Sequence, residues 1–104
     1  APLIFVGHTH VAEYYARSSR GAIVHEHRQN GGSLVLEEGL RYIVNVGSVG
    51  QPRDLNPDAS FVLYDPSART IEWQRVAYAV STVQDKIANV QLPDVCARRL
   101  AVGR

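Results

Sequence analysis

The sequence has little of what marks secreted, membrane or nucleic-acid-binding proteins. Its 104 residues contain one cysteine, Cys96, so an intrachain disulfide and a four-cysteine zinc site are excluded. The net charge is only +1 and the basic residues are scattered, so there is no electrostatic case for a nucleic-acid partner. No apolar segment approaches the roughly 20 residues of a membrane span, and no signal-peptide pattern is present. We expect a cytoplasmic protein.

The chain also lacks methionine, and its first residues fall almost directly on an apolar strand-like run. The length fits one small domain with a modest core. We therefore expect residues 1–104 to be a single portion of a longer polypeptide, with strands over residues 1–78 and helices over residues 80–103.

The expected strands follow from apolar runs and alternation. Leu3–Val6 is a continuous apolar run, typical of a strand buried on both faces. Asn30, Gly31 and Gly32 predict a hairpin whose second strand covers residues 33–36. Further strands are expected at residues 12–17, 22–28, 41–46, 60–64 and 70–78.

The tail changes to helical spacing. Ser81 is expected to cap the first helix, with Gln84 completing a capping box. Pro93 is expected near the start of a second helix, and Gly103 at its end. Strands followed by helices indicate an α+β fold or one layer of a sandwich.

Two histidines, His8 and His10, come directly after the first strand and Gly7. Neutral imidazole is a good ligand for zinc, manganese, iron or nickel. In an extended segment, residues i and i+2 point the same way, so both rings could reach one site or two adjacent ones. The spacing alone fits metal ligands and chance loop histidines equally well.

Other polar residues are weaker candidates. We expect His25 and His27 to lie in a solvent-facing hairpin with a structural role rather than a metal-binding one. Asp54, Asp58 and Asp65 sit in turns beside proline, where carboxylates commonly stabilise the turn. The sequence contains no nucleophile elbow and no phosphate-binding glycine-rich loop.

Three segments together resemble a known family. Gly7-His8-Thr9-His10 after a strand is similar to the closing motif of the calcineurin-like metallophosphoesterases. The stretch from Asn45 to Asp54, continued by 56–65, resembles a bacterial and archaeal branch labelled metallophosphatase or phosphodiesterase. The ending, residues 92–104, also resembles that branch, so the likeness spans the chain.

The resemblance implies the C-terminal half of an α/β/β/α sandwich that holds two divalent metal ions. It implies that His8 and His10 each bind one ion, of manganese, iron, zinc or nickel. The four upstream metal-binding motifs of the family are not in this sequence, so we expect the chain alone to be inactive. Val46 replaces a proline common in the family, which leaves the Asn45 and Ser48 donors in place.

The implied reaction is the hydrolysis of phosphomonoesters or phosphodiesters by two ions about 3.5–4 Å apart. Arg53 is expected to bind the substrate phosphate, because a guanidinium matches phosphate with two parallel hydrogen bonds. Pairing of Arg53 with Asp54 or Asp58 is an equal alternative. Asn45 is a second candidate for substrate contact, although it and Ser48 are better suited to bracing the loop.

Two other classes remain open. The missing ligands favour a non-catalytic, β-rich interaction module or an inactive fragment. A cupin-like barrel is weaker, because no second histidine element follows and the helical tail fits it poorly. Half a sandwich would leave an apolar face uncovered, so we expect the missing N-terminal half or another copy of the chain as a partner.

Overall fold

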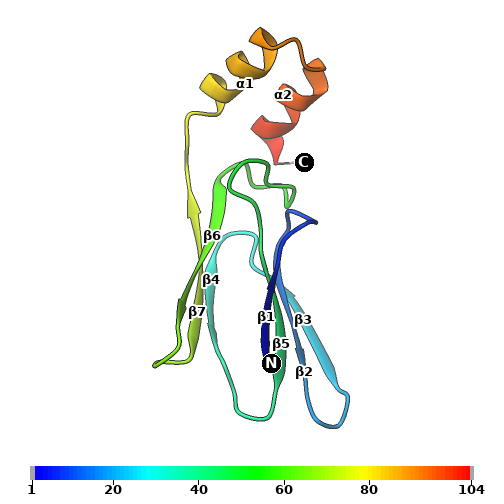
Figure 1. Ribbon diagram of the computed structural model, residues 1–104, viewed down its shortest axis with the longest axis vertical. Coiled ribbons are helices and arrows are strands. Elements are labelled where there is room, and N and C mark those ends of the chain that lie inside the picture. Colours follow the sequence, from blue (N-terminus) through cyan, green and yellow to red (C-terminus); the bar gives the residue numbers. More distant parts are fainter. Residues whose placement is uncertain (1, 104) are drawn as a thin grey trace.

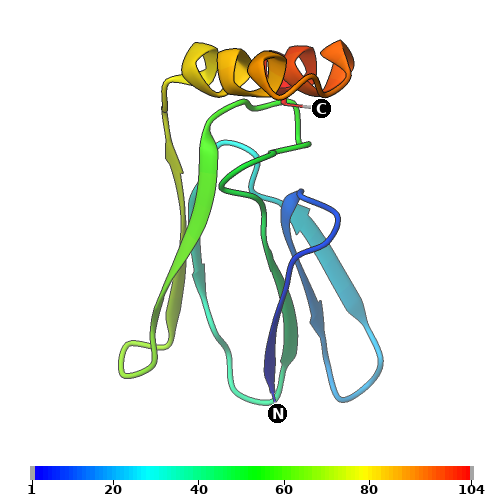
Figure 2. The same cartoon turned by 45° about the horizontal axis from the view of Figure 1, so that its top comes forward.

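Two β-sheets and a helical pair make up the protein. The computed structural model describes residues 2–103; Ala1 and Arg104 lie outside the described residues. The elements are β1 (Leu3–Val6), β2 (Ala12–Arg17), β3 (Ile23–His27), β4 (Gly32–Val35), β5 (Arg41–Val46), β6 (Ala59–Asp65), β7 (Thr70–Val76), α1 (Val80–Asn89) and α2 (Asp94–Val102). Figures 1 and 2 show both helices together at one end of the strands.

The strands form a four-stranded sheet in the order β1-β5-β2-β3 and a three-stranded sheet in the order β4-β7-β6. The β1–β5 pair is parallel, and the other four strand pairs among residues 2–103 are antiparallel. The expected fold class, mostly antiparallel strands followed by two helices, is therefore confirmed. Neither helix of this part of the chain has the length and apolar character needed to cross a membrane.

The core lies between the two sheets. Alternation along β2 and β5 directs Tyr14, Tyr42 and Val44 toward the second sheet, where Ile71 and Trp73 meet them. The Tyr14 and Trp73 rings lie 5.9 Å apart, and the Trp73 indole N–H donates to the Asn45 carbonyl at 3.0 Å. Trp73 therefore joins the sheets by packing and by a hydrogen bond.

The expected burial of Leu3–Val6 on both faces is wrong for the described residues. Strand β1 is an edge strand that pairs with β5 alone. Ile4, Phe5 and Val6 are 50%, 43% and 39% exposed. The continuous apolar run correctly indicates a strand, but the groups that would bury its second edge and outer face are not among residues 2–103.

The expected hairpin at Asn30–Gly32 is also wrong. Strand β3 pairs with β2, whereas β4 pairs with β7 in the other sheet. The chain crosses between the sheets at Arg28, whose guanidinium lies over the Tyr14 and Trp73 rings at 5.0 and 5.7 Å. The glycines therefore mark a crossover, and the hairpin is formed one turn earlier, by β2 and β3.

The start of α1 differs from the expectation, whereas the end of α2 agrees with it. Helix α1 begins after Ala79 without a side-chain cap, so the predicted Ser81 cap is wrong. Gln84 instead donates to the Ala97 carbonyl at 2.8 Å and ties α1 to α2. Gly103 ends α2 in the left-handed conformation, as predicted, and its carbonyl accepts the Leu55 N–H at 2.8 Å.

Gly47 is a position where the two sheets leave no room for a side chain. Its φ is +77°, and an added Cβ would lie 2.6 Å from the Ser60 hydroxyl oxygen and 2.8 Å from its Cβ. Gly39 has a similar φ of +81° but open space around it. A side chain at Gly39 would therefore meet backbone strain alone, whereas a side chain at Gly47 would meet both backbone strain and steric overlap.

We predict that Gly47→Ala costs more folding free energy than Gly39→Ala. Both variants carry the left-handed strain of about 1–2 kcal/mol. Only Gly47→Ala must also displace Ser60, which adds about 1–3 kcal/mol. Equilibrium urea unfolding measures the difference, and equal losses for the two variants would contradict the close approach.

Candidate functional site

The loops that carry the candidate residues leave one edge of the first sheet. Because β1 and β5 are parallel neighbours, with Val6 opposite Asn45, their carboxyl ends lie side by side. The loop after β1, residues 7–11, therefore meets the long loop after β5, residues 47–58, as Figure 1 shows. In open sheets this position, outside the carboxyl ends of parallel strands, is where ligands commonly bind.

His8 and His10 both have left-handed backbone conformations, with φ of 71° and 63°. Between them, the Thr9 N–H donates to the Gly7 carbonyl at 2.9 Å and closes a tight turn. The expected extended geometry of this segment is therefore wrong. Non-glycine residues held in this region carry strain and cluster at ligand sites, so the conformation itself points to a function.

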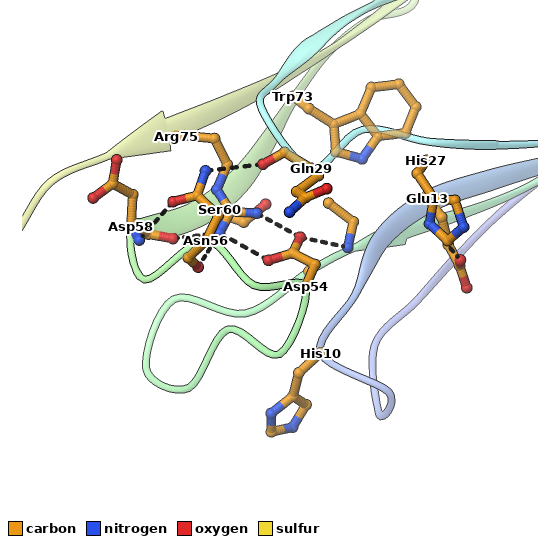
Figure 3. Close-up of polar contacts among 12 residues, drawn as sticks. His10, Glu13, His27, Gln29, Asp54, Asn56, Asp58, Ser60, Trp73 and Arg75 are labelled. Carbon is orange, nitrogen blue, oxygen red and sulfur yellow. Dashed lines mark hydrogen bonds and ion pairs between the residues drawn. The ribbon is translucent and has the colours of Figure 1, made fainter. Parts of the chain in front are cut away.

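The His10 ring has a defined orientation. Its Nδ1 lies 2.8 Å from the Gln51 carbonyl oxygen, and the ring is half-buried. Since a carbonyl only accepts, this contact requires the proton on Nδ1, and in the neutral imidazole Nε2 then keeps a free lone pair. This is the arrangement in which metal-binding histidines are usually held. His8 is exposed. Figure 3 shows the His10 ring pointing away from the neighbouring polar cluster.

Asn45 braces both loops from a buried position. Its amide donates to the Gly7 carbonyl at 3.2 Å and to the Thr9 hydroxyl at 2.7 Å. Its side-chain oxygen, Oδ1, accepts the Gly47 N–H at 3.0 Å. These bonds fix the turn that presents the two histidines. Substrate contact by Asn45 stays a prediction, separate from this bracing role.

Arg53 lies beside His10 although the two are 43 positions apart in the sequence. Its backbone N–H donates to the His10 carbonyl at 2.9 Å. Its exposed guanidinium donates to the Gln51 side chain at 2.7 Å. The same residue, Gln51, thus contacts His10 through its backbone and Arg53 through its side chain. The loop places an exposed cation next to the histidine turn.

Asp54 pairs with Arg75 of β7 rather than with Arg53. The two ion-pair distances are 2.7 and 3.1 Å, and the side chains are 4% and 6% exposed. Asp54 also accepts the Ala12 N–H at 3.1 Å, while Arg75 donates to the Asn56 and Asp58 carbonyls at 2.9 and 2.6 Å (Figure 3). This buried cluster fastens the long loop to β2 and β7.

Arg75 is not among the candidate residues of the sequence analysis. One signal could have identified it. Arg75 follows Ile71 and Trp73 at alternate positions, so its side chain points inward, and a charge at such a position requires a partner. Asp65, by contrast, has the turn role predicted for it. Hydrogen bonds from the Ala68 N–H and from Ser67 hold the pKa of its carboxyl below the usual value.

Tyr14 and Glu26 form a second polar contact, on the inner face of the β2–β3 hairpin. Burial raises the pKa of the Tyr14 phenol, and its hydrogen bond to Glu26 at 2.6 Å adds to the effect. The same hydrogen bond, with help from Arg28, lowers the pKa of the Glu26 carboxyl. Both groups therefore keep their ordinary protonation states at neutral pH, neutral phenol and charged carboxylate.

His25 and His27 are exposed on the hairpin, as predicted, but they also converge on Glu13. One donor atom from each of the three residues lies within 4.8 Å of the other two. Sequence reasoning missed Glu13. The signal was the register, because a hairpin that turns at Ser18–Gly21 places residue 13 opposite residue 27.

We predict that Asp54→Asn destabilises the protein by about 3–5 kcal/mol, because it leaves the Arg75 charge buried without a counter-charge. Changing both residues, as Asp54→Leu with Arg75→Met, should cost less than the sum of the single changes. The exposed Arg69–Glu38 pair is the control, and Glu38→Gln should cost less than about 1 kcal/mol. Urea unfolding measures each variant, and similar small losses for Asp54→Asn and Glu38→Gln would contradict the role of the pair.

The comparisons with known proteins agree with this picture. No family model matches the sequence. Over 103 residues the chain is 39% identical to the uncharacterized protein MJ0912 of Methanocaldococcus jannaschii, a match that covers 98% of this chain and 40% of that protein. It is also similar to the crystal structure of a metallophosphoesterase from Sphaerobacter thermophilus, with a TM-score of 0.88 and 37% identity.

The structural match covers all of this chain and 44% of the Sphaerobacter chain. The chain thus spans less than half the length of both of these proteins. The motif-based resemblance is confirmed: over its whole length, the chain has the fold of a C-terminal portion of a calcineurin-like metallophosphoesterase.

Proposed function

We propose that this chain supplies His8 and His10 as the last two ligands of a dinuclear metal centre that hydrolyses phosphomonoesters or phosphodiesters. The observation that carries the proposal is the His10 ring, whose Nδ1 is held by the Gln51 carbonyl at 2.8 Å so that Nε2 can bind a metal. The structural likeness to a metallophosphoesterase supports the reaction class.

The donor set fits the ions proposed. Imidazole nitrogens suit manganese, iron, zinc and nickel, and they keep the centre positive enough to attract an anionic ester. When bound, such ions supply Lewis-acid polarisation of phosphoryl oxygens and an activated water at neutral pH. The remaining ligands would come from the rest of the domain, in keeping with the greater length of the matched proteins.

Residues of this chain would orient the ester. Arg53 is hydrogen-bonded to His10 through its backbone, and its exposed guanidinium would bind a phosphate oxygen pair. Asn45, Asp54 and Gln51 would keep the histidine turn and the arginine in a fixed relation. A direct bond from Asn45 to substrate is part of the proposal, and it would require the Asn45 amide to exchange one of its present acceptors.

Exposed apolar side chains on the outer face of the first sheet support the proposal that a partner covers it. Ile4 of β1 and Ile43 of β5 lie side by side on this face and are 50% and 44% exposed. An apolar strip of this kind on an otherwise polar surface normally meets another layer. We propose that the missing N-terminal half of the domain, or another copy of the chain, covers it. We also propose a cytoplasmic location, which the single cysteine favours.

We predict that replacing His8 and His10 by alanine in the complete protein abolishes manganese-dependent hydrolysis of bis(p-nitrophenyl) phosphate. Loss of a direct ligand should lower activity by roughly a hundredfold or more, since even supporting residues cost ten- to a hundredfold. Each single substitution should also remove about one bound ion, measured by elemental analysis.

Circular dichroism provides the control that the variants remain folded. Retained activity in the double variant would end the assignment of the ligands. The 104-residue chain by itself should show negligible turnover, because two imidazoles cannot hold two ions. If the complete protein also binds no metal and hydrolyses no ester, the result would favour the alternative, a non-catalytic interaction module.

We predict that Arg53→Ala raises KM about tenfold with a smaller change in kcat, because it removes a charge-assisted hydrogen bond worth about 1.5–3 kcal/mol. Arg69→Ala is the matched control, an exposed arginine paired with Glu38 on the far turn. Steady-state kinetics on a phosphodiester separate the two parameters. Equal KM values for the two variants would contradict substrate binding by Arg53.

A further inference from the structure

We propose that Glu13, His25 and His27 form a second metal site, which binds one divalent transition-metal ion of the zinc type. The site lies on the outer face of the β2–β3 hairpin and uses neither His8 nor His10. It does not depend on the proposed hydrolase function, because it would bind its ion whether or not the protein cleaves an ester.

The strand register brings the three side chains together. Glu13 lies directly opposite His27, and Tyr15 lies opposite His25. Since side chains two apart share a face of a strand, His25 and His27 point the same way as Glu13. The inward positions on this hairpin are taken by Ala12, Tyr14 and Ala16 of the core. The three donors therefore stand on the opposite face (Figure 3, where Glu13 and His27 are labelled).

The distances between the donors suit a single ion. The Glu13 Oε2 lies 2.9 Å from His25 Nε2 and 3.4 Å from His27 Nδ1. Three ligands held 2.0–2.1 Å from a tetrahedral zinc ion lie about 3.3 Å from one another. The widest separation among the three donor atoms is no more than 4.8 Å, so small rotations of the exposed rings would complete the geometry.

The donor types select the class of ion. Two imidazoles and one carboxylate suit zinc, cobalt or nickel, whereas magnesium and calcium favour all-oxygen sites. Three protein ligands leave at least one position open for water or for a further ligand. The neighbouring cation, Arg28, is directed to the inner face, where it pairs with Glu26 at 3.2 Å and lies over Tyr14. It therefore does not compete for Glu13.

The cluster is partly organised before any ion binds. The Tyr15 ring stacks on the His25 ring at 4.2 Å with an angle of 9° between the planes, which limits the rotation of His25. The Glu13 side chain is 12% exposed, whereas His25 and His27 are 37% and 63% exposed. The carboxylate is thus shielded, and both imidazoles remain open to an ion from solvent.

Without an ion, the same contacts are a hydrogen bond between His25 and Glu13 and a close approach of His27 to the same carboxylate. An experiment can separate these readings, because the chain has only four histidines. In a His8→Ala/His10→Ala background of the full chain, every imidazole signal in a proton NMR spectrum belongs to His25 or His27. We expect one equivalent of Zn²⁺ to shift both sets of ring signals.

Calorimetric titration with Zn²⁺ in the same background measures the affinity. Glu13→Gln, His25→Gln and His27→Gln should each weaken binding about tenfold or more, since loss of a ligand costs at least as much as loss of a supporting residue. Glu72→Gln, an exposed carboxylate on β7, is the matched control and should bind as the parent does. Co²⁺ should give the visible absorption of a tetrahedral site in the parent and lose it in Glu13→Gln.

Circular dichroism verifies that each of the three variants remains folded, which separates loss of the site from loss of the fold. Absence of Zn²⁺ binding by the parent, or binding that the three substitutions leave unchanged, would overturn the proposal. Loss of ester hydrolysis in the His8→Ala/His10→Ala protein bears only on the first site. The two proposals therefore fail by different measurements.

Discussion

The buried ion pair between Asp54 and Arg75 is the contact on which the candidate site depends. The long loop after β5 has no regular structure, yet this pair fastens it to β2 and to β7. Asp54 accepts the backbone N–H of Ala12, at the start of β2, and Arg75 gathers two loop carbonyls. Burying such a pair contributes little net stability compared with an apolar replacement, but it accepts few alternative arrangements. Its value here is positional, because it sets Arg53 against His10.

The parallel pairing of β1 with β5 is the second constraint. It brings together two loops that are far apart in sequence, and the polar groups at their meeting point fall into two kinds. Asn45 and Asp54 are buried, and their polar atoms are already bonded to the backbone and to the side chains of Thr9 and Arg75. His8 and Arg53 are exposed and available to a ligand. A site with rigid, satisfied supports beneath reactive groups is well organised for binding ions and anions.

The sequence correctly predicted features that depend on neighbouring residues, and it failed for features that depend on residues distant in the chain. Strand-like and apolar composition correctly predicted β2, β5 and β6, and Gly103 correctly marked the end of α2, because these are local properties. The errors involve partners far away in the chain. Nothing near Asn30 indicates that β4 belongs to the other sheet, and nothing near Asp54 indicates Arg75. Gln84 resembles a capping residue locally, but the Ala97 carbonyl of α2 is its acceptor.

The two histidine pairs show why spacing alone cannot identify a metal site. Both have one residue between the imidazoles, but the backbone brings each pair to its position by a different route. His8 and His10 occupy left-handed conformations in a tight turn, which Asn45 and Gln51 hold in place. His25 and His27 share a face because a strand alternates, and their third donor, Glu13, comes from the neighbouring strand. In both cases the deciding groups are residues outside the motif, which position the rings and supply the remaining contacts. Histidine spacing therefore gains meaning only together with the register or the turn that presents it.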